Sequence, residues 1–375
     1  MKVAINTRLL LKDNLDGIGR FSYEIIKRIV KQNPKAEFHL IFDRNFSKKY
    51  IFSKNVHGHV LSPPTRHPIL WFIWFQFKLP LLLKKINPDV FYSPDGFTST
   101  RLNGLPTVVT IHDINFEHRP DDLNWLHSLY YRTFFQKFAR ISTHITTVSN
   151  FSKIDIIKKY SINEKKISVV YNSVSEKFKP ANDKLKSKTR ERYSSGKNFF
   201  LFVGSLHKRK NLKNLLLAFD GYRINGGQNK LLIIGKKKWW DHETEKVFKK
   251  LGSKNHVKFL GRVSDNEMIN ILASAKALCF VSFFEGFGLP ILEAMKCETP
   301  VICSNTSAMP EVSGNASILV NPNCHNEITN AMLKIDSSSN SEMIAKGILN
   351  LKRFDWYKSA EQIFEILLKA KKNGY

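Results

Sequence analysis

The sequence predicts an α/β protein made of two doubly wound domains, each a parallel sheet covered by helices. Its 375 residues exceed the length that one hydrophobic core usually serves, so two domains are the first expectation. Short apolar runs alternate with amphipathic stretches, a pattern typical of parallel sheets with intervening helices. A stretch rich in Lys, Ser, Asn, Pro and Gly, residues 175–197, breaks this alternation and is interpreted as the connection between the domains, with the boundary near Pro180.

The first domain is expected over residues 1–178 and the second over residues 179–350. Strands of the first are predicted from apolar runs at residues 3–6, 38–42, 90–93, 107–111, 145–148 and 167–171. Strands of the second are predicted at residues 199–203, 231–234, 257–259, 277–281, 300–303 and 317–320. Apolar residues at helical spacing predict helices over residues 341–371, with Phe354 and Trp356 as aromatic anchors. Residues 351–375 are expected to cross back to the first domain.

Residues 69–83 read ILWFIWFQFKLPLLL and are unusually apolar and aromatic. The segment is shorter than the roughly 20 residues that a membrane-spanning helix needs. Two interpretations remain open. The segment is either a buried helix of the first domain or an interfacial element with Lys84 and Lys85 at the level of lipid headgroups.

The formal net charge of +27 predicts a polyanionic partner, such as anionic lipid or a phosphorylated ligand. No DNA- or RNA-binding motif accompanies the charge, so nucleic acid is not expected. Four cysteines at irregular spacing (Cys279, Cys297, Cys303 and Cys324) predict free buried thiols rather than a zinc site or disulfides. The first residues lack the features of a signal peptide, which predicts a cytoplasmic location.

The most informative string is FFEGFGLPILEAM, residues 283–295, in which Glu285 and Glu293 are separated by a glycine-containing turn. It follows a predicted strand and leads into a helix expected to begin near Pro290. A strand end, a turn and a helix N-terminus gather backbone amides that suit an anion or sugar hydroxyls. Alternatively, Glu293 is an ordinary surface residue near a helix start, where carboxylates are favoured.

The whole string resembles the E-x7-E element of the retaining glycosyltransferases of family 4, which have the GT-B fold of two Rossmann-like domains facing across a cleft. The resemblance implies that Glu285 and the backbone after it hold the transferred sugar, while Glu293 binds the ribose hydroxyls of the nucleotide. Two ribose hydroxyls can donate to one carboxylate in a charge-assisted pairing. The donor-binding backbone would comprise Gly286, Phe287, Gly288 and Leu289.

The string FVGSLHKRKN, residues 202–211, is similar to the G-x-x-x-x-R-K-N element of this family. Gly204 permits a tight turn, and Arg209 and Lys210 can reach phosphate oxygens, where cations would stabilise the departing diphosphate. A solvated basic loop is the alternative. Ser205 stands where many members carry an arginine, and the candidates to replace that cation are Arg209, Arg20 and Lys208.

In the first domain, the string GIGR places Gly17, Gly19 and Arg20 in a loop ahead of a helix expected to begin near Phe21. It resembles the family's glycine loop for the donor diphosphate; alone, two glycines carry little information. Arg20 and Asp113 are the candidate acceptor-binding residues.

His112 and Asp113 follow a predicted strand, at the sheet edge where ligands bind. The family's IHD segment favours His112 as a contact to the transferred sugar near the reacting carbon, although a structural histidine is the alternative. The string LGRV lies where the family holds the nucleobase, which implies a role for Arg262 and Val263.

The resemblance implies a retaining hexosyltransferase with Glu285, His112, Arg209 and Lys210 as its catalytic residues. We expect a nucleotide-sugar donor, GDP-mannose first, and a glycan or polyprenyl-diphosphate-linked acceptor in surface polysaccharide synthesis. No cofactor is expected, and no metal, because the sequence contains no D-x-D triplet. The chain would lie on the inner face of the cytoplasmic membrane. Alternatives are a basic nucleic-acid- or membrane-binding protein on a silent GT-B scaffold, and a GT-B epimerase or hydrolase.

Overall fold

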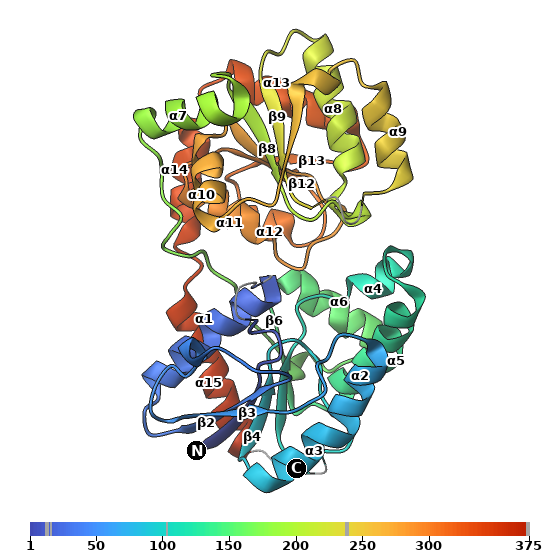
Figure 1. Cartoon of the computed structure of the whole chain (residues 1–375), viewed down its shortest axis with the longest axis vertical. Coiled ribbons are helices and arrows are strands. Elements are labelled where there is room, and N and C mark those ends of the chain that lie inside the picture. Colours follow the sequence, from blue (N-terminus) through green and yellow to red (C-terminus); the bar gives the residue numbers. More distant parts are fainter. Residues whose placement is uncertain (12–14, 16, 103, 237–239, 373–375) are drawn as a thin grey trace. The chain divides into compact units, whose positions relative to one another are not determined.

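A computed structural model of the chain describes all residues except 12–14, 16, 103, 237–239 and 373–375. The chain divides into two compact units (Figure 1). Unit 1 comprises Met1–Asn172 and Asp355–Tyr375, and unit 2 comprises Ser173–Phe354. The sequence placed the divisions after residues 178 and 350, a few residues away. The chain therefore leaves unit 1, completes unit 2 and returns.

Unit 1 contains a seven-stranded parallel sheet with the strand order β3-β2-β1-β4-β5-β6-β7. The chain begins at the middle of the sheet and reverses its direction of growth between β1 and β4, which is the switch point of a doubly wound fold. The strands are β1 (Lys2–Asn6), β2 (Glu37–Phe42), β3 (Val56–Val60), β4 (Val90–Ser93), β5 (Thr107–Thr110), β6 (His144–Thr147) and β7 (Ile167–Val169).

The helices of unit 1 include one from the far end of the chain. They are α1 (Gly17–Gln32), α2 (Pro68–Ile73), α3 (Leu79–Ile86), α4 (Asn115–His118), α5 (Trp125–Ile141), α6 (Asn150–Tyr160) and α15 (Trp356–Lys372). Helix α15 packs along α1, and the rings of Trp356 and Phe21 lie 6.1 Å apart. The expected return of the C-terminal helix to the first domain is confirmed for α15.

The segment of residues 69–83 forms α2, a π-helical turn over Trp74–Lys78, and α3. One side of it is buried against the sheet and supplies Trp71, Trp74, Phe75, Leu79 and Leu83 to the core. The other side leaves four large apolar side chains exposed: Ile69 (58%), Phe72 (38%), Phe77 (43%) and Leu81 (63%). We call these four residues the apolar face. Throughout the described part of the chain, every helix is too short or too polar to cross a membrane.

Unit 2 contains a six-stranded parallel sheet with the order β10-β9-β8-β11-β12-β13. Its strands are β8 (Phe199–Val203), β9 (Lys230–Ile234), β10 (Val257–Gly261), β11 (Ala277–Phe280), β12 (Val301–Ser304) and β13 (Ile318–Val320). The order repeats that of unit 1, with the switch point between β8 and β11. Helices cover both faces, so β8 and β11 are apolar and buried along almost their whole length.

The helices of unit 2 correct one prediction. They are α7 (Asp183–Ser194), α8 (Leu212–Ile224), α9 (His242–Lys250), α10 (Asp265–Ser274), α11 (Leu289–Lys296), α12 (Met309–Ser313), α13 (His325–Ser337) and α14 (Ser341–Leu351). The stretch interpreted as a connection contains α7, whose start is capped by the Asn182 side chain. Helix α14 contacts α11 and belongs to unit 2. The four cysteines are free; three are buried and Cys324 is half-buried.

Candidate active site

The loop after β8 is fixed at the switch point of unit 2. It contains a 3₁₀ turn over Lys208–Lys210, followed by Asn211 in the left-handed conformation (φ 58°). The buried side-chain amide of Asn211 donates to the carbonyls of Val281, 2.9 Å away, and Pro322, 2.7 Å away. The first of these bonds attaches the β8 loop to the chain just after β11. The neutral Asn211 side chain thereby holds the two loops together independently of the charged side chains.

The charged side chains of these two loops meet. The Arg209 guanidinium lies 2.8 Å from one carboxylate oxygen of Glu285 and donates to the Phe284 carbonyl, 2.6 Å away. The Lys210 ammonium lies 2.7 Å from the other carboxylate oxygen. Glu285 is buried, and the two cations are only partly exposed. The structure thus brings together three of the four residues predicted to be catalytic.

The environment of Glu285 favours its charged form. Burial alone would raise the pKa of this carboxyl, but the neighbouring charges of Arg209 and Lys210 lower the pKa to about 2. At neutral pH the carboxylate can therefore only accept hydrogen bonds, which suits the hydroxyls of a sugar.

The turn after Glu285 leads directly into α11. Gly288 adopts a left-handed conformation (φ 109°) at the start of the helix, and Pro290 lies in its first turn. Glu293 lies one turn further along α11 and is 7% exposed, so it is not an ordinary surface residue. The residues from Gly286 to Leu289 thus connect the two glutamates through a turn and a helix N-terminus.

The neighbouring candidate residues differ in exposure. Ser205 and Arg262 are exposed, and Val263 is half-buried. Arg262 and Val263, the two candidates from the LGRV string, lie between β10 and α10. Lys208, one candidate for the missing arginine, is also exposed, whereas Arg209 is engaged by Glu285.

Sequence reasoning overlooked Gly235, which follows β9. A Cβ atom there would lie 1.9 Å from the Gly204 carbonyl oxygen, so only glycine fits. The Gly235 amide donates to the Gly261 carbonyl, 2.8 Å away. Gly235 therefore links the β8 loop to the LGRV turn. The sequence signal that could have identified this residue is a glycine directly after an apolar run that predicts a strand.

In unit 1 the helix begins earlier than predicted. Gly17, Gly19 and Arg20 lie in the first turn of α1, rather than in a loop before a helix near Phe21. Gly19 is buried, Gly17 is exposed and Arg20 is half-buried. Asp16, which precedes the GIGR string, lies outside the described residues.

His112 and Asp113 lie just beyond β5, at the carboxyl edge of the sheet. Nε2 of His112 lies 2.8 Å from the Pro94 carbonyl oxygen, and its ring meets the ring of Phe21 edge-on at 4.8 Å. The Asp113 carboxylate accepts from the Asn115 amide, 2.9 Å away, at the start of α4. That bond gives Asp113 a local structural role, which the acceptor assignment did not anticipate.

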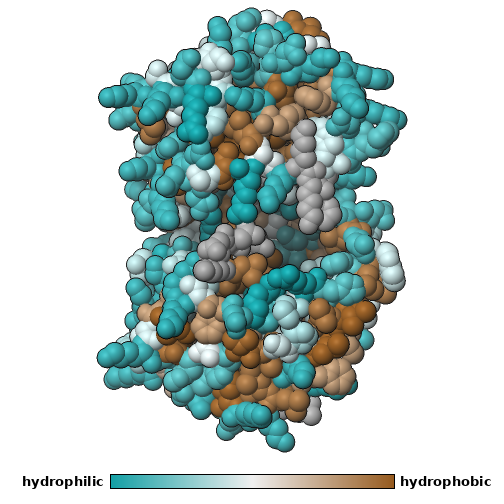
Figure 2. All heavy atoms as spheres, in the orientation of Figure 1, coloured by the Kyte–Doolittle hydropathy of each residue, from teal (hydrophilic) through white to brown (hydrophobic). Residues whose placement is uncertain are grey.

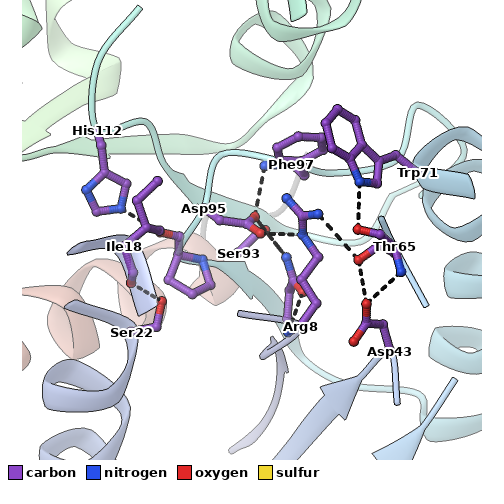
Figure 3. A network of polar contacts seen from close by, with 12 residues as sticks. Arg8, Ile18, Ser22, Asp43, Thr65, Trp71, Ser93, Asp95, Phe97 and His112 are labelled. Atoms are coloured by element: carbon purple, nitrogen blue, oxygen red, sulfur yellow. Dashed lines mark hydrogen bonds and ion pairs between the residues drawn. The ribbon is translucent and has the colours of Figure 1, made fainter. Parts of the chain in front are cut away.

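A buried ion pair in unit 1 was not predicted (Figure 3). Arg8 follows β1 and Asp95 follows β4, and the Arg8 Nε atom donates to the Asp95 carboxylate, 2.6 Å away. Neither residue belongs to a recognised motif, and 86 residues separate them along the chain, so no local pattern signals the pair. The pair spans the switch point of unit 1, as the Glu285 ion pairs span that of unit 2.

The candidate residues thus form two sets. Gly17, Gly19, Arg20, His112 and Asp113 belong to unit 1, and all the others belong to unit 2. Within each unit they follow the carboxyl ends of strands, namely β5 in unit 1 and β8, β10 and β11 in unit 2, or lie in the first turn of α1 or in α11. Ligands of doubly wound folds bind at this edge.

Two protein-family models together match most of the chain. The model described as glycosyl transferases group 1 matches residues 183–348, and the model described as glycosyltransferase family 4 matches residues 15–178. They meet near the junction of the two units.

One relative matches nearly the whole chain and another matches three quarters of it. O-antigen chain mannosyltransferase B of Escherichia coli is 27% identical over 374 residues, which covers 95% of this chain and 96% of that protein. O-antigen chain mannosyltransferase RfbU of Salmonella typhimurium is 28% identical over 291 residues, 75% of each chain. The crystal structure of Anabaena HepE in complex with UDP and glucose superimposes with a TM-score of 0.74 at 18% identity, covering 98% of this chain and 99% of that one. These similarities confirm the predicted GT-B fold class.

Proposed function

Because the chain belongs to the group 1 glycosyltransferases of family 4, we propose that it transfers a hexose, mannose first, from a nucleotide-sugar to a glycan acceptor. The O-antigen mannosyltransferases among its relatives support the sugar, and the UDP complex of HepE supports a nucleotide-linked donor. The observation that carries the proposal is the Glu285 carboxylate held between Arg209 and Lys210 at the switch point of unit 2.

In the proposed reaction, hydroxyls of the transferred sugar donate to Glu285, and ribose hydroxyls donate to Glu293. Arg209 and Lys210 offset the charge that builds up on the diphosphate as the bond between its oxygen and the sugar C1 breaks. The electron pair of that bond goes to the diphosphate. The acceptor oxygen bonds to C1 on the same face and its proton passes to the departing diphosphate, so the anomeric configuration is retained. No metal ion takes part.

Substitution of Glu285 tests the site. Glu285→Gln keeps the size of the side chain but removes the charge, and we expect transfer to fall by at least about 100-fold, the usual loss for one electrostatic group in a reaction centre. Glu243→Gln is the matched control, since Glu243 forms an exposed ion pair with Lys213 in the same unit. An unchanged rate of transfer in Glu285→Gln would show that the proposed site is wrong.

Product analysis tests the chemistry. NMR of the product is expected to show the donor's anomeric configuration, and EDTA is expected to leave the rate unchanged. Incubation without acceptor separates transfer from hydrolysis or epimerisation, because a transferase leaves the donor intact. Thermal stabilisation by a panel of nucleoside diphosphates identifies the base, since ligands that bind the folded state raise the melting temperature by mass action. GDP is expected to stabilise most.

We further propose that unit 1 binds anionic membrane and takes a polyprenyl-diphosphate-linked acceptor there. Figure 2 shows apolar residues gathered on the surface over α2 and α5. Phe72 of the apolar face contacts Phe77 and Phe134, with ring centroids 5.8 Å apart in both pairs. The Arg101 guanidinium lies 4.3 Å above the Phe77 ring. Exposed apolar rings beside cations match the interfacial region of a membrane with anionic lipids.

Sedimentation with liposomes tests the membrane proposal. The double variant Phe72→Ser/Leu81→Ser is expected to reduce binding to phosphatidylglycerol-containing vesicles at low salt at least about tenfold, because it removes two exposed apolar anchors. Ile224→Ser is the control, since Ile224 is 80% exposed in unit 2. Equal sedimentation of the double variant and the parent protein would end the membrane proposal and leave sugar transfer untouched.

A further inference from the structure

Three neighbouring strands of unit 1, β1, β4 and β5, end at one edge of the sheet, and Arg8, Asp95 and His112 follow them. The Asp95 carboxylate accepts four hydrogen bonds. The donors are Nδ2 of Asn6 at 2.9 Å, Nε of Arg8 at 2.6 Å, Oγ of Ser93 at 3.0 Å and the Phe97 amide at 3.2 Å. Two of these donors belong to the end of β1, one is the last residue of β4 and one lies in the turn that contains Asp95, so the carboxylate fixes this turn against β1.

The Arg8 guanidinium is buried in an aromatic environment (Figure 3). It lies 4.1 Å from the ring centroid of Phe97 and 5.7 Å from that of Trp71, which faces it from α2. The Arg8 side chain is 6% exposed and that of Asp95 is 3% exposed. A cation in such surroundings requires its carboxylate partner, because an unpaired buried charge is strongly destabilising. The ion pair between Arg8 and Asp95 therefore keeps the turn after β4 in a single conformation.

The same turn holds the imidazole of His112. Nε2 of His112 lies 2.8 Å from the Pro94 carbonyl oxygen, and a carbonyl can only accept a hydrogen bond. Nε2 must therefore carry a proton. In the neutral ring, Nδ1 then has a lone pair and acts as an acceptor. Pro94 precedes Asp95 directly, so the carboxylate that fixes the turn also fixes the carbonyl that selects the tautomer.

We propose that Arg8 and Asp95 are positioning residues that hold the His112 imidazole through the Pro94 carbonyl, with its proton on Nε2 and Nδ1 as an acceptor. The consequence for transfer rests on the proposed function together with the family resemblance, which implies that His112 contacts the transferred sugar. An imidazole with a fixed acceptor nitrogen recognises a sugar hydroxyl in one orientation. A loosened turn leaves the contact present but misplaced, which lowers the turnover rate more than it lowers donor binding.

NMR of the full chain with ¹⁵N-labelled histidine tests the positioning without reference to activity. His112→Gln identifies the His112 signals, and the parent protein is expected to show an Nε2-bound proton protected from exchange with water. Asp95→Asn, which replaces an acceptor oxygen with an amide group, is expected to lose this protection. Asp43→Asn is the matched control, because Asp43 accepts from Thr65 on the far side of Arg8 in the same network (Figure 3) and is also buried.

Kinetics of the same variants test the consequence. Asp95→Asn is expected to lower kcat at least about tenfold with the donor KM changed less than about threefold, while Asp43→Asn retains kcat. Should Asp95→Asn fail to fold, Arg8→Lys is read in its place, since lysine keeps the charge but loses the planar stacking. An unprotected Nε2 proton in the parent protein overturns the proposal. Full protection of this proton in Asp95→Asn, or in Arg8→Lys where that variant replaces it, overturns the proposal as well. Loss of protection with unchanged kcat in all variants, His112→Gln included, retains the positioning and overturns the role of His112 in transfer.

Discussion

Single residues decide the chemistry of the site in unit 2. Glu285 is buried with two cations on its two oxygens, so the ionised carboxylate contributes to stability as well as to recognition. Removal of one partner from a buried ion pair is strongly destabilising because the remaining charge loses its compensation. The same arrangement keeps Arg209 and Lys210 at the strand ends before a donor arrives.

The low pKa of Glu285 predicts how stability depends on pH. Its ordinary pKa is 4.5 and its folded pKa is about 2, so the stabilisation is complete above pH 4.5 and is lost as the pH falls toward 2. This difference corresponds to about 3 kcal/mol. Glu285→Gln is therefore expected to unfold at lower urea concentration than the parent protein at pH 7, with the gap closing below about pH 4. A gap that persists undiminished at pH 3 would contradict the assigned pKa.

Gly235 is predicted to control the β8 loop sterically. In Gly235→Ala the new Cβ would lie 1.9 Å from the Gly204 carbonyl oxygen, so the loop that carries Arg209 and Lys210 must shift. We expect donor KM to rise about tenfold or more, because misplacement of about 1 Å has effects of this order or larger. Gly252→Ala, whose Cβ would meet nothing closer than 3.8 Å, is expected to behave as the parent protein. Equal kinetics in the two variants would refute this role.

Contacts between residues far apart in the sequence could be predicted only where each residue lies in a recognisable motif. Glu285, Arg209 and Lys210 were predicted as site residues through motifs on each loop, and the shared switch point explains why they meet. Arg8 and Asp95 have no such motif. Their partnership depends on a turn and an aromatic cage built by residues from elsewhere in the chain, which no local pattern records.

At the scale of elements, apolar runs located most strands closely. The predicted bounds of β4 and β8 match those of the structure because both strands are buried along almost their whole length and are mostly apolar. Strand β3 was missed because its sequence VHGHV alternates histidine with small and apolar residues at the sheet edge. Its partners on β2 decide its structure, and pairing between strands is not a local property.

Strand β6 carries an acid-sensitive residue. Burial lowers the pKa of His144 to about 4, with further lowering by Lys166 and Lys369, and Nε2 lies 2.9 Å from the Ser168 hydroxyl on β7. The unfolded chain binds a proton near pH 6.5, so stability is expected to fall between pH 6.5 and pH 4. By pH 5 the loss is at most about 2 kcal/mol, less with solvent screening.

Substitution isolates the effect of His144. His144→Gln can keep a hydrogen bond to Ser168 but does not titrate, so calorimetry is expected to show a smaller decrease in melting temperature from pH 7.5 to pH 5 than in the parent protein. Other histidines, such as His39 and His59, also have pKa values lowered by burial and will leave a residual slope. Identical slopes in the two proteins would show that His144 is not responsible.

At the scale of the whole molecule, unit 1 depends on both ends of the described chain. Trp356 packs against Phe21, and the rings of Phe364 and Phe38 lie 6.5 Å apart, so α15 covers buried aromatic residues of α1 and β2. A chain ending at Phe354 is expected to expose these residues and to aggregate or lose the near-ultraviolet dichroism of unit 1. A chain ending at Lys372 is the control. Soluble, fully dichroic protein from the shorter chain would contradict the importance of α15.

The return of the chain to unit 1 also sets an order of events during synthesis. All seven strands of unit 1 precede unit 2, yet their helical cover is incomplete until α15 has been translated. At about 5–20 residues per second, translation of unit 2 takes roughly 10–40 s. During this time Phe21 and Phe38 lack their contacts with the aromatic rings of α15. Unit 2 is a continuous segment, so all of its strands and helices have been translated before α15. The unit that the ribosome begins second is therefore the first that can finish folding.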